Sequence, residues 1–123
     1  MRYAGPKGAP GMPEMFKPMK LLNGQGLAKV TALITDGRFS GTNNGCFVGH
    51  ISPEAASGGP IALIEDGDKI LVDVVNRRLE LLVDEEVLAA RRAKFHYELP
   101  KVEGYLKRYQ RDAQSADKGG VLL

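Results

Sequence analysis

Apolar residues along the chain gather in short runs separated by turn residues, and these runs predict strands. Residues 29–35 (KVTALIT) form an apolar, partly β-branched run of the kind found in buried strands, and residues 46–51 form a shorter one. Three more strands are predicted at residues 60–64, 69–75 and 78–83, with turn residues between them. We expect these three to form an antiparallel meander on a hydrophobic core.

Helix signals lie before, between and after the predicted strands. Pro13 starts the first helix, which Pro18 keeps short or kinked, and Asp84 caps the third. The predicted helices are residues 13–23, about 52–57, 85–95 and 102–113. The mixture of strands and helices indicates an α/β fold that is rich in β-structure.

The size and charge of the chain narrow the classes of function. Its 123 residues make one domain or a piece of one. Seventeen basic and fifteen acidic residues leave a net charge of +2, which is too balanced for a nucleic-acid-binding or anionic-membrane-binding surface. No apolar stretch is long enough to span a membrane, and residues 1–20 lack the apolar centre of a signal peptide. The single cysteine, Cys46, suits a reducing compartment, so the cytoplasm is the expected location.

Two segments carry polar groups that have possible chemical roles. Arg38, Ser40 and Thr42 lie in a glycine-rich turn after a predicted buried strand, where rigid scaffolds often present reactive groups. The same turn also fits a purely structural interpretation, in which the hydroxyls satisfy local backbone donors. Glu14 offers one oxygen ligand for a hard cation, yet it equally fits an acid at the positive end of a helix dipole.

Other conspicuous residues are expected to be structural. His50 lies in an apolar strand context, which favours a hydrogen-bonded core histidine. Cys46 lies in a β run and is most simply a small buried hydrophobic residue. The sequence contains neither the dinucleotide-binding glycine fingerprint nor the phosphate-binding loop motif. None of these features indicates a function alone.

Three ordered motifs, the last of them in two parts, resemble the dihydroxy-acid dehydratase family. They are residues 5–15 (GPKGAPGMPEM), 35–42 (TDGRFSGT), 49–55 (GHISPEA) and 58–62 (GGPIA). The wider family also contains 6-phosphogluconate and sugar-acid dehydratases, and the first motif and Phe39 look more like the branched-chain member. The resemblance runs over the whole chain, but family members are several times longer. It therefore implies that residues 1–123 are a partial C-terminal domain that lacks its opening strands and the N-terminal domain of the same enzyme.

The resemblance also implies a fold and a reaction. The family's C-terminal domain is a swivelling, mixed β-barrel flanked by helices, here expected to be incomplete at its N-terminus. Its enzymes remove water from a 2,3-dihydroxy acid to give a 2-oxo acid in branched-chain amino acid biosynthesis. Cations must stabilise the negative charge that develops and assist the poor leaving group. In the family these cations are an iron-sulfur cluster and Mg²⁺, with ligands mostly in the N-terminal domain, and Cys46 matches no cluster ligand.

Residue by residue, the resemblance implies these roles in this chain. Ser40 matches the base, a serine alkoxide that takes the proton from C2, and Thr42 matches a hydroxyl that assists proton transfer. Glu14 matches the magnesium ligand that this domain contributes. Arg38 and Gly41 would shape the loop or bind substrate. Because a serine hydroxyl needs a nearby cation to ionise, the isolated chain is expected to be inactive.

Two alternatives remain open at this point. The chain could belong to a sugar-acid dehydratase acting on aldonates or 6-phosphogluconate, or it could be a non-catalytic binding module of the same fold. Homodimers are common in the family, so a homodimer is expected. The missing strands would also leave an open sheet edge, which predicts self-association or domain swapping.

Overall fold

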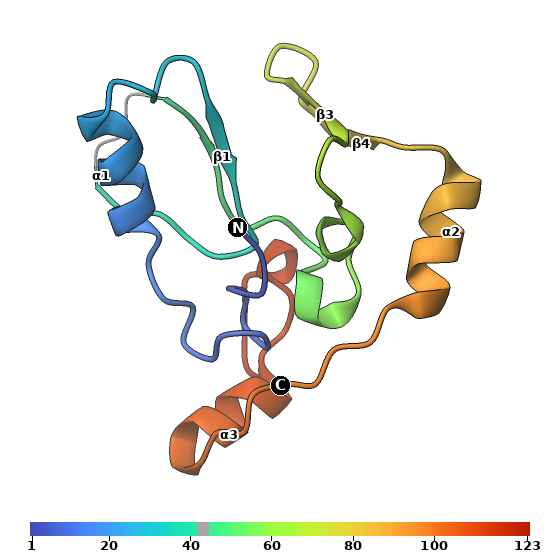
Figure 1. Cartoon of the computed structure of the whole chain (residues 1–123). Coiled ribbons are helices and arrows are strands. Elements are labelled where there is room, and N and C mark those ends of the chain that lie inside the picture. The colour runs from blue at the N-terminus through green and yellow to red at the C-terminus, as the bar shows by residue number, and fades with distance from the viewer. Residues whose placement is uncertain (42–44) are drawn as a thin grey trace.

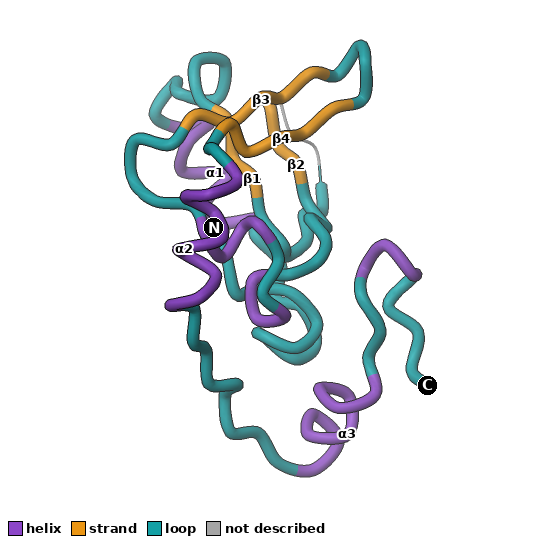
Figure 2. The backbone as a smooth tube through the Cα atoms, turned by 90° about the vertical axis from the view of Figure 1, so that its right-hand side faces the viewer, coloured by secondary structure: helices purple, strands orange, loops and turns teal. Residues whose placement is uncertain are grey.

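The computed structural model describes residues 1–41 and 45–123, and it contains short helices and strands joined by long ordered loops (Figure 1). Within these residues the α-helices are α1 (Phe16–Gly24), α2 (Glu85–Lys94) and α3 (Gly104–Asp112). The strands are β1 (Ala32–Ile34), β2 (Cys46–Val48), β3 (Lys69–Asp73) and β4 (Arg78–Leu82). Three short 3₁₀ helices are Ala55–Ser57, Pro60–Leu63 and Ala116–Lys118. Figures 1 and 2 place α3 at the end of the molecule opposite the β3–β4 hairpin.

The strands form two separate two-stranded sheets. β1 pairs with β2 in parallel, with Ala32 opposite Cys46 and Ile34 opposite Val48, whereas β3 and β4 form an antiparallel hairpin. The predicted mixture of helices and strands is therefore confirmed. The predicted barrel is not: across residues 1–41 and 45–123 the sheets do not close, because a barrel needs more strands than these short ones supply.

Residues 60–64 are a 3₁₀ helix, Pro60–Leu63, so the strand prediction there and the three-stranded meander were wrong. Gly59 explains the difference, because a Cβ on this residue would lie 1.8 Å from the carbonyl oxygen of Pro53, and the close approach turns the chain. The amide of Ala62 donates to the carbonyl of Gly59 at 2.9 Å and closes the first turn. The apolar side chains of this segment are buried in the core, and short apolar runs do not distinguish buried strands from buried helices.

The first helix begins at Phe16, three residues later than the predicted start at Pro13. Pro18 therefore lies in the first turn, where its missing N–H would have had no partner within the helix. The helix is short, as predicted, and it includes Gly24, one residue past the predicted end at residue 23.

Two residues that were expected to be buried are exposed. Cys46 is the first residue of β2 and faces solvent at the end of a sheet of only two strands. His50 is also exposed, and it adopts a left-handed backbone conformation with φ +56° just after β2. The prediction for His50 was wrong because β2 ends at Val48, before this residue. The prediction for Cys46 was wrong because the first position of β2 is exposed and only the two residues after it are partly buried. No helix in the described part of the chain is long and apolar enough to cross a membrane.

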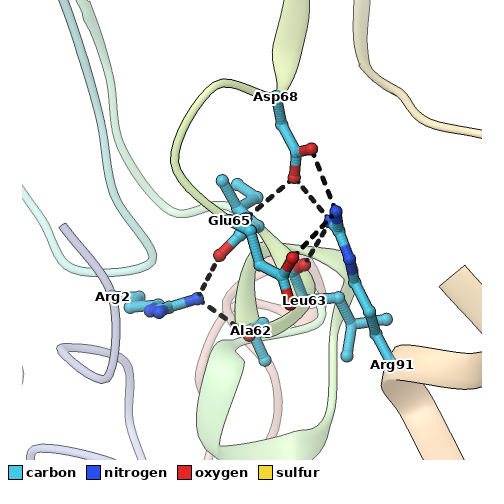
Figure 3. Close-up of polar contacts among 7 residues, drawn as sticks. Arg2, Ala62, Leu63, Glu65, Asp68 and Arg91 are labelled. Carbon is cyan, nitrogen blue, oxygen red and sulfur yellow. Dashed lines mark hydrogen bonds and ion pairs between the residues drawn. The ribbon is translucent and has the colours of Figure 1, made fainter. Parts of the chain in front are cut away.

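Two arginines hold the segment that follows the Pro60–Leu63 helix (Figure 3). Arg91 on α2 donates to the carbonyl of Leu63 at 2.9 Å and to both carboxylate oxygens of Asp68, at 2.5 and 3.1 Å. Arg2, from the other end of the chain, donates to the carbonyls of Ala62 and Ile64, each at 2.8 Å. The N-terminal segment and α2 are thereby fixed to the same short stretch of backbone.

The pair of Arg91 and Asp68 predicts part of the acid sensitivity of the fold. The hydrogen bond from Arg91, together with the backbone N–H of Glu65, holds the pKa of Asp68 below its ordinary value of 3.8. The stabilisation by this carboxylate is therefore present above pH 3.8 and is lost as the pH falls through the lower folded-state pKa. We expect Asp68→Asn to reduce the decline of the urea midpoint between about pH 5 and about pH 2, measured by circular dichroism. Asp66→Asn, in the same turn but exposed, is the control, and an equal decline in both variants would contradict the prediction.

Candidate functional site

The segment that carries Glu14 and the turn that follows β1 lie side by side. Glu14 and Arg38 form an isolated parallel β-bridge, in which the amide of Met15 donates to the carbonyl of Arg38 at 2.8 Å. The glycine at position 37 lets the same turn lie against the N-terminal segment, because a Cβ there would lie 2.9 Å from the Cβ of Ala4. The motif that carries Glu14 and the motif that carries Ser40 are thus neighbours in space.

Ser40 and Glu14 are in direct contact at this junction. The hydroxyl of Ser40 donates a short hydrogen bond to Oε1 of Glu14, across 26 residues of sequence. Both side chains are exposed, so a ligand can reach them. A hydroxyl that donates to a carboxylate directs its proton toward it and leaves its lone pairs for another partner. The arrangement can therefore hold or transfer a proton at Oγ of Ser40.

The structure shows no direct contact of this kind for the other predicted site residues, Arg38 and Gly41, within the part of the chain that it describes. Arg38 is exposed, and its Nε donates to the carbonyl of Met12 at 2.7 Å, so part of the guanidinium is bound to the protein's own backbone. Gly41 has φ +77° and lies beside α1, where a Cβ would be 3.8 Å from the ring of Phe16. Thr42 lies outside the described residues. The roles of all these residues in binding or catalysis remain predictions.

Two buried carboxylates, Asp36 and Glu54, fix the backbone of the site, and neither was predicted from the sequence. Asp36 is fully buried and accepts hydrogen bonds from the amides of Tyr3 (3.1 Å), Ala4 (2.9 Å) and Ala55 (2.8 Å). It immediately precedes the glycine-rich turn, so it joins that turn to the N-terminal segment. Buried carboxylates are stable only when fully hydrogen-bonded, and here the donors are backbone N–H groups.

Glu54 fixes the backbone of the loop that leads to Glu14. Its carboxylate is 5% exposed and accepts hydrogen bonds from the amides of Lys7 (2.9 Å) and Gly8 (2.9 Å). No signal in the sequence marks this role, because the groups that Glu54 binds are backbone amides, which every residue type except proline carries.

The described residues supply few ligands for a cation. Glu14 and Ser40 offer oxygen atoms, the donor type that Mg²⁺ prefers, but a Mg²⁺ ion takes about six ligands. No three His, Cys, Asp or Glu side chains come together in residues 1–41 and 45–123 in a way that could hold a metal ion. With one cysteine in the chain, an iron-sulfur cluster does not fit its residues. The donor set therefore suits a contributor to a magnesium site and not a complete one.

A family model and several curated relatives match nearly the whole chain. Residues 1–120 match the family described as "Dihydroxy-acid/6-phosphogluconate dehydratase C-terminal". The chain is 59% identical over 122 residues to a dihydroxy-acid dehydratase of Geobacter sulfurreducens, and the match covers 98% of the chain. It is 57% identical over 123 residues to one of Syntrophobacter fumaroxidans and 55% identical over 122 residues to one of Pyrococcus abyssi, with 99% of the chain covered in each case. The chain spans 22% of the length of each relative.

Proposed function

Because the chain belongs to the C-terminal family of dihydroxy-acid and 6-phosphogluconate dehydratases, we propose that it supplies the C-terminal part of a dihydroxy-acid dehydratase. Such an enzyme converts 2,3-dihydroxy-3-methyl carboxylic acids to 2-oxo acids in branched-chain amino acid biosynthesis. The observation that carries the proposal is the contact between Ser40 and Glu14, at the junction of two family-like motifs. The relatives named dihydroxy-acid dehydratase, at 54 to 59% identity, favour this substrate class over aldonates or 6-phosphogluconate.

The proposed reaction assigns the proton transfer to Ser40. Ser40 acts as an alkoxide: the C2–H bond breaks and its proton goes to Oγ, and the bond between C3 and its hydroxyl breaks. The proton held by Oγ then passes to the departing hydroxide, which leaves as water and returns Ser40 to the alkoxide. The enol that remains becomes the ketone of the 2-oxo acid, so the products are one 2-oxo acid and one water. In the hydroxyl form, the Oγ–H of Ser40 points at Oε1 of Glu14, so the proton that Ser40 must lose to become the base has an acceptor beside it.

Glu14 is proposed to serve as the contribution of this chain to a cation site. A divalent cation bound beside the site, with most ligands outside this chain, would supply the positive charge that lowers the pKa of a neighbouring hydroxyl. The role of this chain is to hold the carboxylate of Glu14 and the hydroxyl of Ser40 together. Thr42 is proposed to assist proton transfer beside Ser40, as the resemblance implies.

A chimera tests the proposed function. The corresponding C-terminal segment of the Geobacter sulfurreducens relative, which is 59% identical, is replaced by this chain. We expect the purified chimera, loaded with iron-sulfur cluster and Mg²⁺, to form 2-oxo acid from 2,3-dihydroxy-isovalerate, and the isolated chain to form none. Turnover of gluconate in place of the branched acid would favour the sugar-acid alternative. No turnover by a folded, loaded chimera would contradict the proposal.

The open sheet edges predict association with other copies or with the rest of a longer enzyme. Among the described residues, β1 and β2 pair as strands with each other alone. The N-terminal amine of Met1 donates to the carbonyl of Ile34, the last residue of β1, at 2.8 Å. Unpaired strand edges are ready to pair with another chain. We expect the isolated chain to show a mass above that of a monomer in light scattering, rising with concentration. A constant monomer mass at high concentration would contradict this.

A further inference from the structure

Arg38 contacts the segment of Glu14 on both sides of that residue. Its side-chain Nε donates to the carbonyl of Met12 at 2.7 Å, two residues before Glu14. Its own carbonyl accepts a hydrogen bond from the amide of Met15 at 2.8 Å, one residue after Glu14. Glu14 is therefore held between two hydrogen bonds from a single residue, and Ser40 lies two positions further along the same extended segment.

The backbone at Met12 adopts a conformation that needs outside support. Met12 has φ +48°, in the left-handed region that a side chain with a Cβ disfavours, and Gly11 before it has φ +91°. The amide of Met12 is held by the carbonyl of Ala9 at 2.8 Å, and its carbonyl is held by Arg38. Unfavourable backbone conformations persist where the surrounding contacts fix them. The side chain of Arg38 thus stabilises the turn that leads into Glu14.

The other face of the Arg38 segment is anchored separately. The ring of Phe39 packs against the ring of Phe47 on β2, with 5.9 Å between their centroids. Arg38 and Ser40 both lie against the Glu14 segment, because Nε of Arg38 donates to the carbonyl of Met12 and the hydroxyl of Ser40 donates to Glu14. The two side chains therefore act on the same neighbour, one on the turn before Glu14 and one on its carboxylate.

We propose that Arg38 is a positioning residue, which holds the backbone around Glu14 so that its carboxylate meets the hydroxyl of Ser40. The inference rests on the proposed function for the importance of that pair, but its geometry stands without it. It differs from substrate binding, one of the two roles that the resemblance implies, because a substrate carboxylate would use the charge of the guanidinium, whereas the contact to Met12 uses a single N–H donor at Nε and does not depend on the charge.

Side-chain geometry offers variants that separate these roles. The amide nitrogen of glutamine occupies the position of Nε in arginine, so Arg38→Gln keeps a donor for the carbonyl of Met12 and loses the charge. Arg38→Met keeps a side chain that reaches the position of Nε and loses the donor there. Arg38→Lys keeps the charge but moves the donor one bond further out. Positioning therefore predicts that glutamine replaces arginine better than lysine does.

The first experiment needs no enzyme activity. In the full chain, we measure amide hydrogen exchange at Met15 and the nuclear Overhauser contacts between the side chains of Glu14 and Ser40. We expect Arg38→Met to accelerate exchange at Met15 by about tenfold or more and to remove the contacts, and Arg38→Gln to stay within about threefold of wild type. Arg92→Met, an exposed arginine on α2, is the matched control and should change neither readout.

The proposal is overturned if Arg38→Met leaves both readouts unchanged, or if Arg38→Gln is as damaging as Arg38→Met. Should Arg38→Met fail to fold by circular dichroism, the glutamine and lysine variants still decide, since glutamine must then preserve the contacts better than lysine. In the chimera, positioning predicts a lowered kcat for Arg38→Lys with KM little changed, whereas substrate binding predicts a raised KM for Arg38→Gln. An inactive chimera would contradict the proposed function and would leave the exchange results to decide the role of Arg38.

Discussion

Replacing Ser40 by alanine in the chimera is expected to lower kcat by about a thousandfold, which lies in the range that a positioned general base contributes. The methyl group of alanine cannot take the proton from C2, and the partner of Oε1 of Glu14 is lost at the same time. Because Ser40 is exposed, its removal should leave the fold unchanged. KM should change little, since the proton transfer is made in the transition state. Initial rates of 2-oxo acid formation from 2,3-dihydroxy-isovalerate measure the effect.

The matched control for that variant is Ser57→Ala, which removes another exposed hydroxyl at the end of the Ala55–Ser57 helix. It should keep full activity. Iron content and circular dichroism of each preparation confirm that cofactor loading and folding are equal. Unchanged turnover of Ser40→Ala would mean that the turn is architectural, and it would favour the non-catalytic binding module.

Replacing Asp36 by alanine is expected to be the most destabilising single change in the fold. The carboxylate is fully buried and accepts the amides of Tyr3, Ala4 and Ala55, so its loss leaves three donors without a partner. At about 1 to 3 kcal/mol for each unsatisfied buried donor, the free energy of unfolding should fall by about 3 kcal/mol or more. That is a large fraction of the total stability of a small domain. Urea denaturation followed by circular dichroism measures it.

Asparagine at position 36 should be less damaging than alanine. Oδ2 accepts two of the three amides, so the one oxygen of asparagine can keep those two hydrogen bonds, and only the amide of Ala4 loses its acceptor. Asp66→Ala, which removes an exposed carboxylate, is the control and should change the stability little. A loss below about 1 kcal/mol for Asp36→Ala would show that the N-terminal segment does not depend on this carboxylate.

Local signals predicted the elements whose contacts are local. The hairpin was expected at residues 69–75 and 78–83 and is found at Lys69–Asp73 and Arg78–Leu82, because alternating apolar positions and a turn at Asn76 and Arg77 decide it. The helix α2 matches its prediction to within one residue. The Pro60–Leu63 helix was missed because its apolar composition fits a strand equally well. The close approach of Gly59 to the carbonyl of Pro53, which favours the helix over the strand, leaves no signal in the pattern of apolar residues.

The residues of the candidate site could be predicted from the sequence, but the contacts that bring them together could not. The motifs identified Glu14 and Ser40 separately, and the structure brings them into contact across 26 residues. What brings them together is the binding of backbone amides by Asp36 and Glu54, and of the Met12 carbonyl by Arg38. Backbone groups are the same for every residue type, so the sequence pattern does not show which side chain will bind them.

A double-mutant cycle on Ser40 and Glu14 in the chimera tests the central claim most directly, namely that the two side chains work as one catalytic unit. The measurement is kcat/KM for the unmodified chimera, Ser40→Ala, Glu14→Gln and the double variant, with cofactor loading matched. Residues that act as a unit give strongly non-additive losses, so the double variant should be no slower than the slower single variant. Losses that simply multiply would show that Ser40 and Glu14 act independently, and the proposed site would be wrong.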